Sequence, residues 1–325
     1  MNLYMILITG SAGYIGSEIC KKFEKSKKNY IGIDDLKYSY KKNVYNKKKF
    51  IKACISDNNA ISKIIKKYKI SFILHTAAFA YVNDAEKNKK KYFNNNVTKT
   101  KKFILNIKKH NVKNFIFLSS SNVYSEKKNI KKFYENHSTN PKNFYGKTKL
   151  KIEKFLLQHK KSFNNLIILR LFNIIGLTKN FKAKEFDNFK SQRLLFKFFR
   201  SIKKKIPITI RYISKKSGNY IFPSRDFLDI KDLTFLIKKI LKFCEKKRVC
   251  DIYNVGSGKT VSLDQIINLI NKNYNKNLII KYTKIPKKEY KDTYSSVDKI
   301  TKKFNWEKKI NIKESINSYK KFLKF

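Results

Sequence analysis

A tyrosine and a lysine four residues apart are the residues of this chain whose types and spacing point most directly to chemistry. Residues 145–149 read Tyr-Gly-Lys-Thr-Lys, in a stretch with a helical pattern. This spacing puts the phenol of Tyr145 and the ammonium of Lys149 on one helical face, one turn apart. A nearby cation favours the phenolate, so the pair could make the tyrosine a base. Because the chain holds 76 Lys and Arg residues, a solvated helix face is the alternative interpretation.

A glycine-rich turn near the N-terminus predicts a nucleotide-binding site. Apolar residues 4–8 have the pattern of a strand buried on both faces, and a helical stretch covers residues 17–25. Between them, Gly10, Gly13 and Gly16 would let the backbone approach a pyrophosphate at the helix N-terminus, although a structural turn is the alternative.

An acidic residue ends the second predicted strand, residues 30–33. Asp34 stands where a carboxylate binds the ribose hydroxyls of a dinucleotide, and it disfavours a 2′-phosphate. The sequence therefore favours NAD over NADP.

Apolar strands alternate with helical patterns through the first half of the chain. Strands are predicted at residues 71–75, 114–118 and 166–171, and helices at 94–110 and 147–159. This alternation predicts an α/β fold with a doubly wound parallel (Rossmann) sheet. After Gly176 the pattern loosens, with a loop expected around residues 215–223 and a more polar final third. We expect a second, smaller α/β lobe there.

The composition is strongly basic, with a formal net charge of +53. Such a charge would suit a polyanion partner. The lysines are spread along the whole chain, however, and Lys, Asn, Ile, Phe and Tyr share A/T-rich codons, so nucleotide bias also explains the excess. The four cysteines have neither metal-ligand nor disulfide-framework spacing, and no segment has the layout of a signal peptide or membrane span. We expect a cytoplasmic protein with no metal, no membrane association and no specific nucleic-acid partner.

A serine at the end of strand 114–118 completes an ordered set of motifs. Ser120 precedes Tyr145 by 25 residues and would face the cofactor crevice. The glycine turn, Asp34, Ser120 and the Tyr-x-x-x-Lys pair, in this order, resemble the extended short-chain dehydrogenase/reductase family. Within it, they resemble the NAD-dependent nucleotide-sugar epimerases and dehydratases.

The resemblance extends over nearly all 325 residues. The further matching segments are His75-Thr76-Ala77-Ala78, Asn94-Asn95-Asn96-Val97, Leu169-Arg170-Leu171-Phe172-Asn173, Arg225-Asp226-Phe227-Leu228-Asp229-Ile230, Tyr253 to Gly258 and Asn305-Trp306. The resemblance implies Ser120, Tyr145 and Lys149 as catalytic residues. It implies substrate contacts at Ser120, Asn173 and Arg225, where a guanidinium fork suits a diphosphate. It implies cofactor contacts at Gly10, Ala12, Gly13, Tyr14, Ile15, Gly16, Asp34, Ile55, Ala77, Ala78, Asn96, Tyr145 and Lys149.

The residues after Ser120 select among the family's reactions. Sugar 4,6-dehydratases resemble Thr-Asp-Glu-Val-Tyr there, and UDP-glucuronate decarboxylases carry a Glu where this chain has Asn122. Ser121 and Asn122 do not titrate usefully, so both reactions would lack their proton-transfer group. The Ser-x-x-Val-Tyr form resembles the 4-epimerases of UDP-hexoses.

Four positions depart from the epimerase pattern. Cys54 stands where an Asp usually meets the adenine, Ala80 replaces a Lys, and Asp229 replaces a His. An Arg expected near residues 286–292 is absent, and Lys287 or Lys288 is its candidate substitute.

The resemblance therefore implies NAD-dependent epimerisation at C4 of a UDP-hexose through a transient 4-keto sugar, in a homodimer. The alternatives are a UDP-uronate or UDP-N-acetylhexosamine 4-epimerase, an NAD(P)H-dependent 4-keto-sugar reductase, and a polyanion-binding protein on a degenerate Rossmann scaffold. The expected domains are an NAD-binding domain, residues 1–176 with 226–256 returning to it, and a nucleotide-sugar lobe, residues 177–225 and 257–325.

Overall fold

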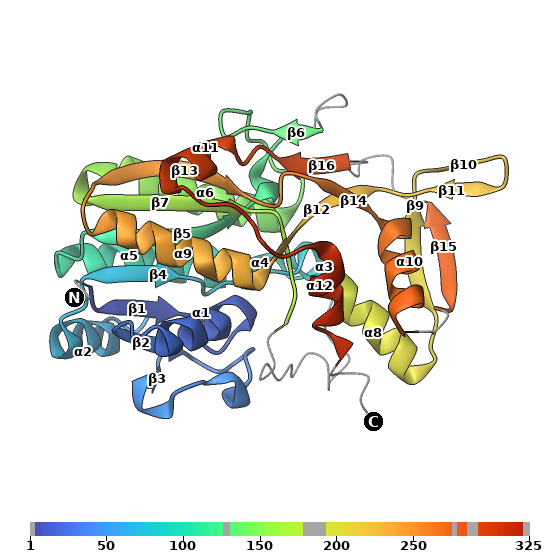
Figure 1. The fold of residues 1–325 in the computed structure, drawn as a ribbon. Helices are drawn as coiled ribbons and strands as arrows, with labels where there is room; N and C mark the ends of the chain where they lie inside the picture. The colour runs from blue at the N-terminus through green and yellow to red at the C-terminus, as the bar shows by residue number, and fades with distance from the viewer. Residues whose placement is uncertain (1–3, 126–130, 178–192, 275–277, 285–291, 321–325) are drawn as a thin grey trace.

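Seven parallel strands form the central sheet of the molecule (Figure 1). The computed structural model describes residues 4–125, 131–177, 193–274, 278–284 and 292–320. The strand order is β13-β7-β5-β4-β1-β2-β3, which reverses direction at β1 as in a doubly wound fold, so the predicted fold class is confirmed. The strands are β1 (Ile6–Thr9), β2 (Tyr30–Asp34), β3 (Phe50–Lys52), β4 (Phe72–His75), β5 (Asn114–Ser120), β7 (Asn165–Leu171) and β13 (Val249–Val255).

Helices cover both faces of this sheet, which is why its strands are continuous apolar runs. Ile6 and Ile8 point into one core, and Leu7 between them points into the other, as strand alternation requires. The first core is closed by α1 (Tyr14–Lys25), α9 (Ile230–Cys244) and α11 (Asp298–Phe304). The second is closed by α2 (Asn58–Tyr68), α5 (Lys99–Lys109) and α6 (Phe144–Gln158). None of the helices in the described part of the chain combines the length and apolarity needed to cross a membrane.

The segment predicted as one helix, residues 94–110, has a different start. Two short helices, α3 (Val82–Lys87) and α4 (Lys89–Phe93), lead into a π-helical turn, η3 (Asn94–Thr98), and only then does α5 begin. Short 3-10 turns also occur, at η1 (Lys41–Asn43), η2 (Lys47–Lys49), η4 (Ser121–Val123) and η5 (Lys160–Ser162).

A third apolar core lies at the other end of the molecule (Figure 1). Its elements are α8 (Leu194–Lys204), β9 (Ile208–Tyr212), α10 (Leu263–Tyr274), β15 (Ile280–Lys284) and α12 (Ile312–Asn317). The loop predicted around residues 215–223 was wrong, because β10 (Ser214–Lys216) and β11 (Asn219–Ile221) pair as an antiparallel hairpin. Ser217 and Gly218 both adopt positive φ at its turn, and this is the geometry that two-residue hairpin turns require.

A second sheet joins the two ends of the fold. Its strands are β14 (Thr260–Ser262), β12 (Ser224–Asp229), β16 (Asp292–Ser295) and β6 (Lys132–Phe133), and β8 (Asn173–Ile175) also pairs with β12. Because this sheet takes strands from both expected domains, the domain boundaries at residues 176, 226 and 256 stay predictions.

The first turn of α1 is packed so closely against the end of β1 that no residue larger than glycine fits at position 16. An added Cβ at Gly16 would overlap the carbonyl oxygen of Gly10 and lie 2.9 Å from the Thr76 Oγ1. At Gly13, the same atom would meet only the Gly10 carbonyl oxygen, at 3.2 Å.

We therefore expect Gly16→Ala to lower the free energy of unfolding by about 1–3 kcal/mol, the usual cost of overpacking. Gly13→Ala is the matched control and should cost clearly less. Urea denaturation of the two variants beside the wild type measures both values. Equal stabilities for the two variants would contradict this description of the turn.

Candidate active site

A cleft of about 800 Å³ runs along the carboxyl ends of the central strands. It is lined by most of the cofactor contacts expected from the sequence: Gly10, Gly13, Tyr14, Ile15, Gly16, Asp34, Ile55, Ala77, Ala78, Tyr145 and Lys149. Cys54 and Ala80, which depart from the family pattern, line it as well. The structure thus brings residues from five separate segments together at one edge of the sheet.

The N-terminus of α1 opens onto this cleft. Its N-cap residue, Gly13, makes no side-chain capping bond, and its first turn carries no acidic residue. The first amide groups of a helix lack partners within the helix and concentrate partial positive charge. This end of the cleft therefore suits a phosphate group.

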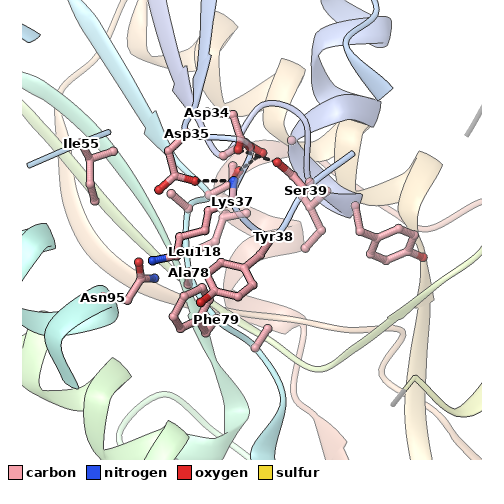
Figure 2. A pocket seen from close by; sticks show the side chains of 18 of the residues that line it. Asp34, Asp35, Lys37, Tyr38, Ser39, Ile55, Ala78, Phe79, Asn95 and Leu118 are labelled. Carbon is pink, nitrogen blue, oxygen red and sulfur yellow. Dashed lines mark hydrogen bonds between the residues drawn. The ribbon is translucent and has the colours of Figure 1, made fainter. Parts of the chain in front are cut away.

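Asp34 organises the neighbouring loop as well as facing the cleft (Figure 2). Its Oδ1 accepts hydrogen bonds from the Ser39 hydroxyl at 2.5 Å and the Leu36 amide at 2.9 Å. Its Oδ2 accepts one from the Ala12 amide at 3.1 Å, which is how Ala12 contributes without lining the cleft. Burial raises the pKa of this carboxyl, and the three hydrogen bonds oppose the rise. A carboxylate accepts about four hydrogen bonds, so Oδ2 keeps capacity for a ribose hydroxyl.

Asn96 also acts from behind the cleft wall. Its side chain accepts from the Phe79 amide and donates to the Phe79 carbonyl, both at 2.9 Å. It thereby fixes the loop after β4, whose residues 76–81 line the cleft.

Several cleft residues carry no signal in the sequence. Tyr38 and Phe79 meet edge to face in the cleft wall, with ring centroids 4.5 Å apart (Figure 2). The Lys91 ammonium lies 4.5 Å from the Tyr38 ring centroid. Lys37, Lys99 and Arg193 line the cleft too. These residues come from loops and helix ends, and in so Lys-rich a chain no spacing singles them out.

Lys149 is an ammonium almost fully shielded from solvent, with 5% of its surface exposed. Its Nζ donates to the Leu118 carbonyl at 2.7 Å and lies 4.8 Å from the Phe117 ring centroid. Burial lowers its pKa to about 7, against the opposing effect of Glu153.

Burial and the Lys149 charge together lower the pKa of His75 to about 3, so this imidazole is neutral.

The expected depression of the Tyr145 pKa is not found in the protein alone. Burial raises this pKa to about 12, and a hydrogen bond with Ser120 and the charge of Arg193 act in the opposite direction. The reason is physical: the low dielectric that surrounds Lys149 also penalises the phenolate. The phenol needs further positive charge before it can act as a base near neutral pH.

The Ser120 hydroxyl is oriented by the residue that replaces the dehydratase acid. Asn122 donates two hydrogen bonds to Ser120 Oγ, from its amide at 3.2 Å and from its side chain at 3.1 Å. Asn143, the N-cap of α6, holds the Asn122 side chain by donating to Oδ1 at 2.9 Å. These bonds hold the Ser120 oxygen in place, and its hydroxyl proton can be donated to Tyr145.

None of the three predicted substrate residues, Ser120, Asn173 and Arg225, is among the residues that line the described cleft. The Asn173 side chain donates to the Asp226 carbonyl, and Arg225 donates to the Ser224 carbonyl. Asp229 caps α9 by accepting from the Lys231 amide and also accepts from the Ser315 hydroxyl, which gives it a structural role. Lys287 and Lys288 lie outside the described residues.

Together these features fit NAD. The cleft has the volume of a cofactor site, the N-terminus of α1 suits a diphosphate, Asp34 can accept from a ribose, and Lys149 lines the cleft together with Tyr145.

The depressed pKa of Lys149 has a consequence for stability. An unfolded Lys titrates near ~10.4, so between pH 7 and 10 the unfolded state binds more protons than the folded state. The contribution of Lys149 to stability therefore rises with pH in this window, by up to about 1.4 kcal/mol per unit. Lys149→Met should remove this rise, and Lys147→Met, exposed on the same helix, should keep it. Urea denaturation from pH 6 to pH 10 tests this, and parallel curves for wild type and Lys149→Met would contradict it.

Comparison with known proteins identifies the family. The model of the "NAD dependent epimerase/dehydratase family" matches residues 6–256. Similar relatives include UDP-arabinose 4-epimerase 1 of Arabidopsis thaliana, 28% identical over 96% of this chain and 78% of that protein. The UDP-glucose 4-epimerase of Lactobacillus helveticus is 29% identical over 81% of this chain and 79% of that protein.

A solved structure of a UDP-glucose 4-epimerase superposes with a TM-score of 0.89, at 25% identity over 97% of each chain. The described fold, the cleft and the family match agree with one another. This chain belongs to the NAD dependent epimerase/dehydratase family.

Proposed function

We propose that this chain is an NAD-dependent isomerase that inverts the configuration at C4 of a UDP-linked sugar. The observation that carries the proposal is the Ser120-Tyr145-Lys149 constellation, with Asn122 beside it in place of a titratable residue. Such a site can move one proton and accommodate a hydride transfer, but it lacks the groups that eliminate water. The names of the relatives, which are 4-epimerases of UDP-arabinose and UDP-glucose, support the same reaction.

Tyr145 is the proposed base for the sugar 4-hydroxyl. NAD, when bound, supplies a hydride acceptor and a positive charge. Because the Tyr145 pKa is about 12 in the protein alone, the phenol stays protonated until further positive charge favours its ionised form. Lys149 is proposed to hold the nicotinamide ribose and to stabilise the phenolate.

Ser120 is proposed to bridge the sugar hydroxyl and Tyr145. The sugar 4-hydroxyl would take the place of one of the two Asn122 donors on Ser120 Oγ, while the Ser120 proton is donated to the phenol oxygen. When the 4-keto sugar turns and is reduced on its other face, Tyr145 returns the proton.

The remaining parts of the proposal rest on the family resemblance. Asn173 and Arg225 are proposed to contact the UDP moiety from the sheet that holds β8 and β12. The two-domain division and a cytoplasmic location belong to the same proposal, and the four free cysteines suit a reducing compartment.

We also propose a homodimer. Large apolar side chains are exposed on three helices, of which α6 contacts the two others: Phe93 on α4, Leu105 on α5 and Leu157 on α6. A homodimer interface is more apolar than the rest of a protein surface and would cover such side chains.

Purified protein should carry NAD(H) and interconvert C4 epimers without added reductant. The panel is UDP-glucose and UDP-galactose, UDP-xylose and UDP-arabinose, and the N-acetylhexosamine and uronate forms, with products identified by NMR. Tyr145→Phe should lower kcat by at least about 100-fold because it removes the proton acceptor. Tyr45→Phe, at an exposed loop tyrosine, is the matched control and should leave kcat unchanged.

Two results would contradict the proposal. Stoichiometric consumption of NAD(P)H would indicate a 4-keto-sugar reductase instead. Turnover that survives in Tyr145→Phe would mean that another residue is the base.

Light scattering after gel filtration should give twice the 38.6 kDa mass of the chain. Leu105→Glu should shift the protein towards the monomer, because it puts a charge in the proposed interface. Ile279→Glu, at an equally exposed apolar residue next to β15, should leave the dimer intact. A dimer that is unaffected by Leu105→Glu would exclude this interface.

A further inference from the structure

A buried carboxylate lies directly behind the catalytic residues and is not used in the reaction proposed above. Glu153 follows Lys149 by four residues on α6, so the two side chains lie one turn apart on the same helical face. Only 1% of Glu153 is exposed. Its Oε1 accepts from the Ser119 hydroxyl at 2.5 Å, and Ser119 both lines the cleft and precedes Ser120. The Glu153 carboxylate is therefore connected to Lys149 through helix α6 and to Ser120 through the neighbouring Ser119.

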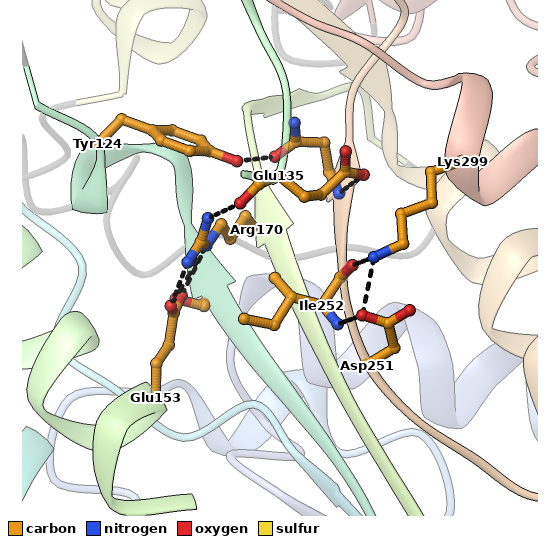
Figure 3. Close-up of polar contacts among 9 residues, drawn as sticks. Tyr124, Glu135, Glu153, Arg170, Asp251, Ile252 and Lys299 are labelled. Carbon is orange, nitrogen blue, oxygen red and sulfur yellow. Dashed lines mark hydrogen bonds and ion pairs between the residues drawn. The ribbon is translucent and has the colours of Figure 1, made fainter. Parts of the chain in front are cut away.

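Arg170 holds this carboxylate in place (Figure 3). Its Nη2 donates to Glu153 Oε2 at 2.8 Å, and its Nε donates to both oxygens at 3.2 Å. The guanidinium also donates to the Glu135 carbonyl at 3.1 Å and lies 4.8 Å from the Tyr124 ring centroid. Removing a charge pair from water costs free energy, and these additional hydrogen bonds help to offset that cost here.

Hydrogen bonds from Tyr124 continue to Asn254 on β13, an edge strand of the central sheet. Tyr124 donates to Asn254 Oδ1 at 2.6 Å, and the Asn254 amide donates to Glu135 Oε1 at 2.8 Å (Figure 3). Elements β5, β7, β13 and α6 are thus tied to a single carboxylate, which cannot shift without disturbing the strand end that carries Ser120.

The charges around Lys149 are few. Its helix contributes Tyr145 and Glu153, β4 contributes the neutral His75, and β7 contributes Arg170 through Glu153. The cleft adds Asp34, Lys99 and Arg193 along its length. Among these groups, Glu153 is the negative charge that acts on Lys149.

We propose that Glu153 is a positioning residue of this active site, which keeps the Lys149 ammonium charged and, through Ser119, fixes the strand end that carries Ser120. The inference rests on the proposed function in so far as that function needs a charged Lys149. Arg170 has the supporting role of holding the carboxylate, and neither residue touches a reacting atom.

The expected effect of removing Glu153 has a definite sign. With Glu153 present, burial leaves the pKa of Lys149 at about 7. Without it, the stabilisation of the ammonium is lost and this pKa falls further. Lys149 then loses its charge at a lower pH, and whatever depends on that charge fails earlier as pH rises.

The test compares Glu153→Gln with wild type between pH 5 and pH 10, using the full chain with its bound cofactor. Release of NAD into the filtrate after a fixed incubation is one readout, and it needs no sugar. Turnover of whichever UDP-sugar the wild type accepts is the other. In Glu153→Gln, the pH above which NAD is released and the pH above which turnover falls should both be lower by on the order of one unit. An opposite charge within ~4–6 Å produces a pKa shift of this size.

Two variants separate charge from folding. Glu153→Gln leaves Arg170 buried without its partner, so the double variant Glu153→Gln/Arg170→Met removes both charges and should show the same acid shift. Glu153→Asp keeps the carboxylate and should restore most of the wild-type profile. Glu245→Gln removes the carboxylate of the Lys28 ion pair, at the C-terminal end of α9, and is the matched control that should leave both pH values unchanged.

Superimposable NAD-release profiles for wild type and the Glu153→Gln proteins would overturn the inference, as would an equal shift in Glu245→Gln. If no UDP-sugar is converted by any of the proteins, the proposed function fails. NAD release still decides the role of Glu153 in that case.

Discussion

The burial of one lysine constrains the rest of this active site. Lys149 lies beneath the carboxyl edge of the sheet, where an ammonium is stable only if the protein replaces the water it has lost. The Leu118 carbonyl, the Phe117 ring and the charge of Glu153 do this from strand β5 and helix α6. Their positions depend on the register between β5 and β7, and hence on the parallel sheet as a whole.

The same low-dielectric surroundings raise the pKa of Tyr145, which opposes formation of the phenolate. Burial raises the pKa of Tyr145 to about 12 while it lowers that of Lys149 to about 7, so near neutral pH the phenol is protonated and Lys149 is only partly charged. In the proposed mechanism, Tyr145 can therefore act as a base only when more positive charge enters the cleft. That requirement would link proton transfer to the presence of the oxidised cofactor. Ser120, oriented by Asn122 and Asn143, supplies the hydrogen bond that favours the ionised form.

The fold and the centre of the site could be predicted from the sequence because they depend on local patterns. Continuous apolar runs are the consequence of strands covered on both faces, and Gly10 and Gly16 stand where an added Cβ would strike the backbone. The pair Tyr145 and Lys149 follows from helical spacing alone. Glu153 extends that spacing by one more turn, so it could have been found in the same way.

Other features depend on contacts that no local pattern encodes. The Tyr38–Phe79 contact joins two loops 41 positions apart in the chain, and abundant lysines hide Lys91 among many equivalents. The hairpin at residues 214–221 was missed because its turn uses Ser217, a residue that rarely adopts positive φ. The rise in the Tyr145 pKa follows from burial, which the sequence gives only on average.

The central claim is that one site removes the hydrogen from C4 and returns it to the same carbon. A UDP-sugar carrying deuterium at C4 tests this directly, with both C4 epimers analysed by deuterium NMR and mass spectrometry after equilibration. We expect deuterium to remain at C4 in both epimers, because the C4 hydrogen would move as a hydride to the bound cofactor and back, and only the hydroxyl proton would pass to Tyr145. Loss of the deuterium to water, or its appearance at another carbon, would contradict the account.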